Sequence, residues 1–202
     1  MKNYLKLMLL VIAFPAFGQT DTSGQLADVL AFQQKMNGEF EDPETSPLKE
    51  EQQQEFESLD FYPVNLNYRV VAKIARVEKQ KIFKMKTTTD REPEYVKFAE
   101  ASFTLMGKEC KINIYQNVAL REQEKYRNSL FLPFTDLTNG EETYGGGRYI
   151  DLEIPEGEEI IIDFNKAYNP YCAYNSRYSC PVPPKENFIN MKISAGVKMF
   201  EY

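Results

Sequence analysis

The spacing of apolar residues changes near residue 67, and this change constrains the fold more than any other feature of the chain. Beyond it, apolar and polar side chains alternate over short stretches, which is typical of strands with one buried face. The connections are too short for the helical crossovers that parallel strands need. We therefore expect a mainly β (α+β) fold with an antiparallel sheet, built as a split barrel or a sandwich. The predicted strands cover residues 68–75, 83–85, 95–105, 110–118, 130–134, 148–154, 160–165 and 188–193.

Helical spacing occurs only earlier, in residues 19–61. Thr22 or Ser23 can cap a first amphipathic helix that Gly38 would end, and its apolar stripe comprises Leu26, Val29, Leu30, Phe32 and Met36. Ser46 followed by Pro47 is a second start signal, for a helix over residues 48–59. We expect two helices packed on a β domain of residues 62–202.

Charge is concentrated in that helical segment. Residues 19–61 contain eleven acidic and two basic side chains, whereas residues 62–202 are close to neutral. The chain has no basic stripe with interleaved aromatic residues, so we expect no nucleic-acid partner.

The first eighteen residues have the organisation of a secretory signal peptide. Lys2 and Lys6 precede an apolar stretch over residues 7–17, and small residues stand at Ala16 and Gly18. The stretch is too short to span a bilayer, although an uncleaved anchor is the alternative. We expect cleavage after residue 18, a periplasmic or secreted protein, and no stable membrane insertion of the mature chain.

Histidine is absent and cysteine is scarce. The lack of histidine excludes Ser-His and Cys-His nucleophile pairs and a histidine general base. Cys172 and Cys180 lie eight residues apart in a segment rich in Pro, Tyr and Asn, and an oxidising compartment favours a disulfide between them. Free thiols, a metal site and a redox pair are the alternatives. Cys110 alternates with apolar residues and should point into the core.

Residues 131–196 form a block of unusual composition. Its motifs are Pro133-Phe134-x-Asp136, Thr143-Tyr144-Gly145-Gly146-Gly147-Arg148-Tyr149, Asp163-Phe164-Asn165-x-Ala167-Tyr168-Asn169-Pro170, Cys172 and Cys180-Pro181-x-Pro183-Pro184-x-Glu186-Asn187. Together with Ser46-Pro47-Leu48, these motifs resemble an uncharacterised bacterial family, domain of unknown function 1684. Val197 departs from the pattern, where the resemblance leads us to expect glutamate. The resemblance implies no activity.

The same block holds the candidate binding residues. Three glycines before Arg148 would let backbone N–H groups approach a ligand, and the guanidinium could bind a carboxylate or phosphate. Asp163 and Asn165 share one strand face, as do Tyr149 and Asp151. A salt-bridged hairpin turn, and a polar network that satisfies the loop backbone, are the structural alternatives. The candidate residues are Tyr144, Gly145, Gly146, Gly147, Arg148, Asp163, Asn165, Asn169, Glu186 and Asn187.

Three classes of function remain compatible with the sequence. The first is a small-molecule-binding β domain, with a flavin-type cofactor on Arg148 and the glycines as one variant. The second is an enzyme of carboxylate or tyrosine chemistry, hydrolase-like, that would use Asp163, Glu186, Tyr144 and Arg148. The third is an envelope interaction protein that docks through its acidic helices. No cofactor, metal site or protein partner is identified by the sequence.

Overall fold

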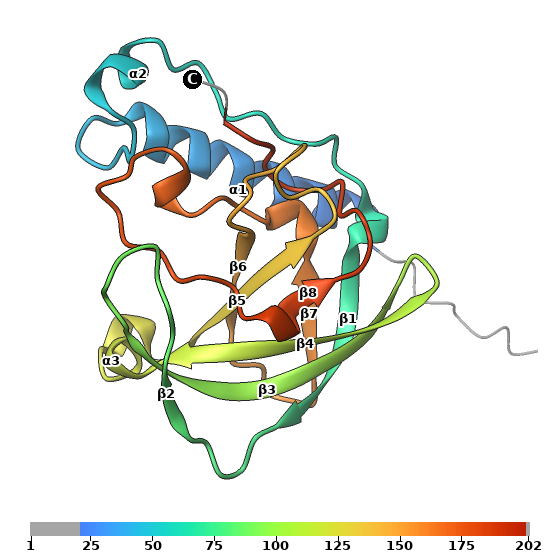
Figure 1. Ribbon diagram of the computed structural model, residues 1–202. Coiled ribbons are helices and arrows are strands. Elements are labelled where there is room, and N and C mark those ends of the chain that lie inside the picture. The colour runs from blue at the N-terminus through green and yellow to red at the C-terminus, as the bar shows by residue number, and fades with distance from the viewer. Residues whose placement is uncertain (1–20, 201–202) are drawn as a thin grey trace, which may run out of the picture.

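The computed structural model describes residues 21–200, so the predicted signal peptide lies outside the described residues. Eight strands form one curled sheet that makes a half-barrel (Figure 1). The strand path is β6-β5-β4-β3-β1-β7, with β2 added to β3 and β8 added to β5. The strands are β1 (Arg69–Arg76), β2 (Ile82–Lys84), β3 (Glu94–Leu105), β4 (Lys108–Asn117), β5 (Ser129–Asp136), β6 (Arg148–Glu153), β7 (Glu159–Asp163) and β8 (Phe188–Ile189).

The sheet confirms the predicted antiparallel pairing, with one exception. The short strand β8 runs parallel to β5, where Thr135 pairs with Phe188. The long hairpin β3–β4 turns at Met106 and Gly107, whose φ angles of 48° and 77° suit a two-residue hairpin turn. This turn lies one residue earlier than the glycine-lysine pair that the sequence indicates.

The core lies inside the curl of the sheet. Alternate residues of neighbouring strands point inward, so apolar side chains meet there and leave water. Fully buried members from five strands include Ala72, Ala101, Leu105, Ile112, Ile114, Leu130, Leu132, Phe134 and Ile162. Cys110 is half-buried and packs against this core, as predicted. The strands β6 and β7 stand at the two ends of the path, so the half-barrel is open between them.

Helix α1 (Thr22–Glu41) covers one end of the half-barrel, beside the irregular segment that follows β7 (Figure 1). Its N-cap is Asp21, whose carboxylate accepts a hydrogen bond from Gly24 N at 2.9 Å. The buried stripe is Val29, Met36 and Phe40, whereas the expected core residues Leu26 and Leu30 are exposed. The helix also continues three residues past the predicted stop at glycine 38.

The second predicted helix is much shorter than expected. Helix α2 covers only Glu50–Gln54. Ser46 does not cap it: its hydroxyl accepts a hydrogen bond from Leu48 N at 3.3 Å and shapes a turn that buries Leu48. The proline after Ser46 therefore belongs to this turn rather than to a first helical position.

The remaining helices are single turns. They are α3 (Val118–Arg121) and the 3₁₀ turns η1 (Leu66–Tyr68), η2 (Glu124–Tyr126), η3 (Phe164–Lys166), η4 (Tyr171–Ala173) and η5 (Lys185–Asn187). Within residues 21–200, no helix is long and apolar enough to cross a membrane.

Candidate functional site

Arg148 begins strand β6 with its side chain turned into the protein. It is 0% exposed and pairs with the carboxylate of Asp136 at 2.9 Å. Its guanidinium also donates to the carbonyl oxygens of Ile193 (2.8 Å), Val197 (3.4 Å) and Ala195. Burial lowers the pKa of Arg148, and the charge of Asp136 opposes this shift. The structure therefore corrects the expectation of an anion site here, because the guanidinium fastens the C-terminal segment to the sheet.

The three glycines before Arg148 form a turn that packs closely. Gly147 N donates to Tyr144 O at 3.1 Å. Gly147 has a φ of +90°, and a Cβ there would lie 2.6 Å from the carbonyl oxygen of Phe134. An L side chain would be strained at that φ and would clash. Gly147 therefore allows the turn to pack closely against strand β5. Gly145 and Gly146 are exposed.

Asp163 and Asn165 tie the end of β7 to two distant segments. Asp163 accepts from Arg69 at 2.9 Å and from Asn165 N at 3.0 Å. The Asn165 amide donates to Asn65 O and accepts from Asn65 N, at 3.0 and 2.9 Å. Both side chains are buried, so these contacts match the loop-stabilising alternative.

The four remaining candidates lie in separate parts of the structure. The amide of Asn187 pairs with both backbone groups of Asn113, at 2.9 and 2.8 Å, and donates to Pro133 O at 2.7 Å. Asn169 donates to Lys198 O at 2.9 Å, and Glu186 is exposed. Tyr144 lies 3.7 Å from the sulfur of Cys172. The ten predicted site residues therefore do not converge on one cavity.

Cys172 and Cys180 are adjacent free thiols, which corrects the predicted disulfide. Cys172 N donates to the sulfur of Cys180 at 3.2 Å. Hydrogen bonds to the segment before β3 hold this loop instead: Cys180 O accepts from Thr88 N at 2.9 Å, and Arg91 donates to Ser179 O at 2.7 Å. Hydrogen bonds to the Cys172 sulfur, from Cys180 and then from the hydroxyls of Tyr144 and Thr88, lower the pKa of Cys172.

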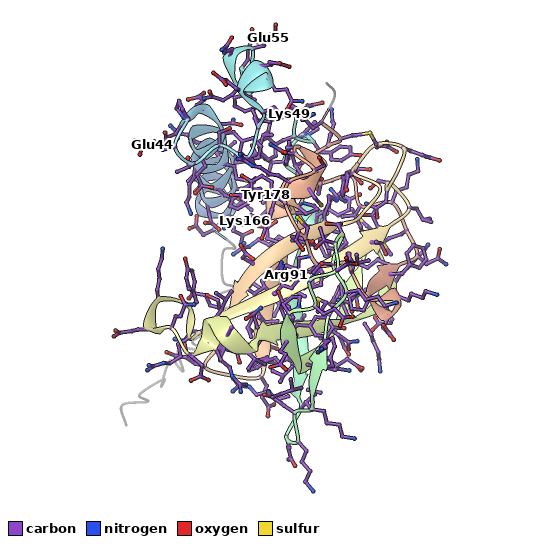
Figure 2. The ribbon with its side chains drawn as sticks, turned by 60° about the vertical axis from the view of Figure 1, so that its left-hand side comes forward. Glu44, Lys49, Glu55, Arg91, Lys166 and Tyr178 are labelled. Atoms are coloured by element: carbon purple, nitrogen blue, oxygen red, sulfur yellow. The ribbon has the colours of Figure 1, made fainter. Side chains whose placement is uncertain are left out.

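A cavity of about 450 Å³ lies between α1, strand β6 and the segment after β7. This volume falls in the range of small-molecule sites. Figure 2 shows Tyr178, which lines the cavity, beside α1. Eight of the seventeen lining residues are aromatic: Phe32, Phe40, Tyr95, Phe131, Tyr149, Tyr168, Tyr171 and Tyr178. The charged side chains among the lining residues are Lys35, Glu39 and Asp151.

Asp151 is one of two carboxylates in this wall, and Glu39 is the other. Its side chain is open to solvent in the cavity, but protein atoms surround it on most sides. This partial desolvation raises the pKa of Asp151, while a hydrogen bond with Tyr168 and the charge of Lys35 act in the opposite direction. Desolvation and the neighbouring carboxylate also raise the pKa of Tyr168 well above its ordinary value, so its hydroxyl remains a donor.

Backbone contacts fix the positions of these two groups. Tyr149 and Tyr168 exchange N–H···O bonds at 2.9 and 3.0 Å, so the segment after β7 is held against the start of β6. The hydroxyl of Tyr149 donates to Pro181 O, which closes the wall near the cysteines. The predicted shared face of Tyr149 and Asp151 is confirmed, because both side chains line the cavity.

A second cavity of about 540 Å³ lies next to the first and shares Asp151 and Leu120 with it. Its other wall is an ion-pair network that ties α1 to the half-barrel. Asp28 of α1 contacts Lys166 at 2.7 Å and Arg69 at 3.7 Å. Figure 2 shows Lys166 at the base of α1. Asp151 therefore lines both cavities.

The sequence offered only part of the signal for this cavity. Alternation on β6 places Tyr149 and Asp151 on one face, but neither was a leading candidate. The contribution of Phe32, Lys35 and Phe40 depends on how α1 packs against the sheet, which helical periodicity alone does not specify. Among residues 21–200, no group of three or more potential metal-ligating side chains is present.

Comparison with known proteins relates this chain to an uncharacterised family and to a solved structure, among others. A family described as "Protein of unknown function (DUF1684)" matches residues 54–198. The solution NMR structure of an uncharacterized protein of Haloarcula marismortui is similar with a TM-score of 0.69 and 32% sequence identity. The match covers 88% of this chain and 96% of that one. No curated protein matches.

Proposed function

The chain belongs to the DUF1684 family, and we propose that it binds a small organic molecule in the aromatic cavity beside α1. One observation carries this proposal: eight aromatic side chains and the carboxylate of Asp151 line a space of about 450 Å³. Binding sites for small molecules combine a mostly apolar wall with a few placed polar groups. The hydrogen bond between Asp151 and Tyr168 supplies such a polar point.

The stability of the wall supports the same function. The rings of Phe131 and Tyr149 are 4.7 Å apart at 72°, and those of Tyr149 and Tyr168 are 5.8 Å apart at 90°. Edge-to-face contacts of this kind fix ring positions. The site is therefore shaped before a ligand enters, which lowers the entropic cost of binding.

Export is the second part of the proposal. The basic residues, short apolar stretch and small residues of positions 1–18 support secretion into the periplasm or the medium. Fractionation of the producing cells, with mass spectrometry of the mature N-terminus, tests this. A mature chain that begins at Gln19 in the envelope or medium is expected, and an intact Met1 in the cytosol would contradict it.

The binding proposal is tested by a thermal shift screen of the purified protein against a metabolite library. A ligand should raise the melting temperature of the wild type and of Leu137→Trp, an exposed leucine outside the cavity. It should not do so for Leu120→Trp, because Leu120 lines the cavity and a larger side chain narrows it. If the screen finds no ligand, or if a ligand raises the melting temperatures of both variants equally, the cavity is not the binding site.

A catalytic role is the second candidate, and Asp151 with Tyr168 is the observation that favours it. Both groups titrate away from their ordinary pKa, and such groups concentrate at functional sites. They replace Asp163 and Arg148, whose contacts are with the protein itself. Turnover of an identified ligand by the wild type but not by Tyr168→Phe would establish catalysis, whereas recovery of unchanged ligand from the wild type would exclude it.

A further inference from the structure

We propose that the ligand of the aromatic cavity carries a cationic amine on an aromatic or apolar body, with the amine beside Asp151. This inference rests on the proposed binding function and specifies its ligand class. The alternatives are a neutral ligand and an anionic ligand, and the wall distinguishes the three by its charge and its rings.

Charge is the first argument. Within residues 21–200, no lysine or arginine nitrogen forms an ion pair with Asp151 at 4.0 Å or less, although ten other carboxylates have such partners. The two other charged lining residues, Lys35 and Glu39, pair with each other at 3.6 Å. The lining residues therefore carry one net negative charge, which favours a cation and repels an anion.

The surrounding cations are also engaged elsewhere. Arg69 and Lys166, on the neighbouring wall, contact Asp163 and Asp28. Arg91 donates to the backbone and hydroxyl of Ser179, which lines the cavity. None of these groups is available to Asp151 without breaking a contact that positions a loop or a helix.

The aromatic wall is the second argument. The negative faces of tyrosine and phenylalanine rings attract organic cations, and several rings at steep mutual angles form a cage for them. The ring centroids of Tyr171 and Tyr178 lie 5.2 Å apart at an angle of 60°, and both rings line the same cavity as Tyr149 and Tyr168. When an ammonium group binds among these rings, it loses its contacts with water. Contacts with ring faces and with one carboxylate take their place.

Hydrogen bonding at Asp151 is the third argument. Asp151 interacts with the Tyr168 hydroxyl and also lines the cavity, so a ligand in the cavity can reach its carboxylate. Partial desolvation makes the ionised carboxylate costly, which its raised pKa reflects. A bound ammonium provides the carboxylate with an opposite charge and a hydrogen-bond donor, whereas a neutral alcohol provides only a donor.

Matched probes test the inference. Tryptamine, tryptophol and indole-3-acetate share an indole and carry a cation, a neutral hydroxyl and an anion. Phenethylamine, phenethyl alcohol and phenylacetate repeat this series on a smaller ring. Because the chain contains no tryptophan, indole fluorescence excited at a wavelength that tyrosine does not absorb reports the probe alone. Calorimetry serves the other series.

The amine should bind about tenfold or more tightly than the alcohol of its series, since a cation–π contact and a charge-assisted hydrogen bond together contribute about 1.4 kcal/mol or more. Asp151→Asn should remove this preference, because the amide keeps an acceptor for the alcohol but has no charge to attract the amine. Glu153→Gln is the matched control, because Glu153 lies on the same strand and lines only the second cavity. It should keep the preference, and circular dichroism should show that all variants fold.

Two outcomes distinguish a failure of the amine inference from a failure of the proposed binding function. If alcohols or carboxylates bind as tightly as amines, or if Asp151→Asn leaves amine binding unchanged, the amine inference is overturned while binding in the cavity stands. If no probe binds and the wider library also gives no ligand, both proposals are overturned.

Discussion

Replacement of Arg148 by methionine should destabilise the protein severely. The change keeps an unbranched side chain beside Phe134 but removes all guanidinium donors. Asp136 would keep its charge with no cationic partner in a site where both side chains are fully buried. The carbonyl oxygens of Ile193 and Ala195 would each lose a donor.

The expected loss of stability follows from the contacts that Arg148→Met removes. Breaking a buried ion pair by removing one partner costs about 3–5 kcal/mol. In a chain of this size, 1 kcal/mol lowers the melting temperature by about 2–4 °C. Arg148→Met should therefore melt about 6–20 °C below the wild type. Adding Asp136→Asn should recover part of the loss, because the unpaired charge disappears while an acceptor for Thr138 N remains.

Urea unfolding followed by circular dichroism, together with thermal melts, measures this effect. Lys192→Met is the control, since it breaks the exposed pair with Glu142 and should melt close to the wild type. A wild-type melting temperature for Arg148→Met would refute the structural role. If ligand binding were lost at unchanged stability, the anion site predicted from the sequence would be restored.

Three further changes test other parts of the structure. Gly147→Ala should lower the free energy of unfolding in urea by about 1–3 kcal/mol, because φ is +90° and a backbone oxygen blocks the new methyl group. Gly157→Ala, whose methyl group would meet open space, should change it by no more than about 0.5 kcal/mol. Desolvation raises the pKa of Asp151 in the folded state, so ionised Asp151 opposes folding at neutral pH and this penalty disappears below the unfolded pKa of about 4. Asp151→Asn should consequently raise the melting temperature at pH 7 and leave it unchanged at pH 3; a fall at pH 7 would contradict the shift. Iodoacetamide should alkylate Cys172 at a lower pH than Cys110, because hydrogen bonds lower the pKa of the first thiol and burial raises that of the second, and peptide mass spectrometry would reveal the reverse order.

The strands were predictable because their signal is local. Ile112 and Ile114 alternate with polar residues on β4, and a period of two places them on one face whatever the rest of the chain does. The prediction of a helix over residues 48–59 was wrong for the opposite reason, because packing with distant residues decides the structure there. Ser46 and the following proline suit a turn as well as a helix start, and the packing of Leu48 decides between them.

The candidate site was harder to predict, because ligand contacts and loop support use the same residue types. The segment after β7 has little regular structure, and its buried backbone groups need partners. Asn165 and Asn187 meet that need with paired amide contacts to Asn65 and Asn113. Their sequence pattern is equally that of a binding site. Only the three-dimensional arrangement shows that Asp151 faces open space.

The wall of the cavity has two sources in the chain. Strand β6 and the segment after β7 lie within the part that the family shares, residues 54–198, whereas α1 lies before it. Phe32, Lys35 and Phe40 stand on helix α1, and Asp151 stands on strand β6 of the half-barrel. A protein built in this way can acquire a new ligand by altering one helix, without disturbing the barrel that supports the carboxylate.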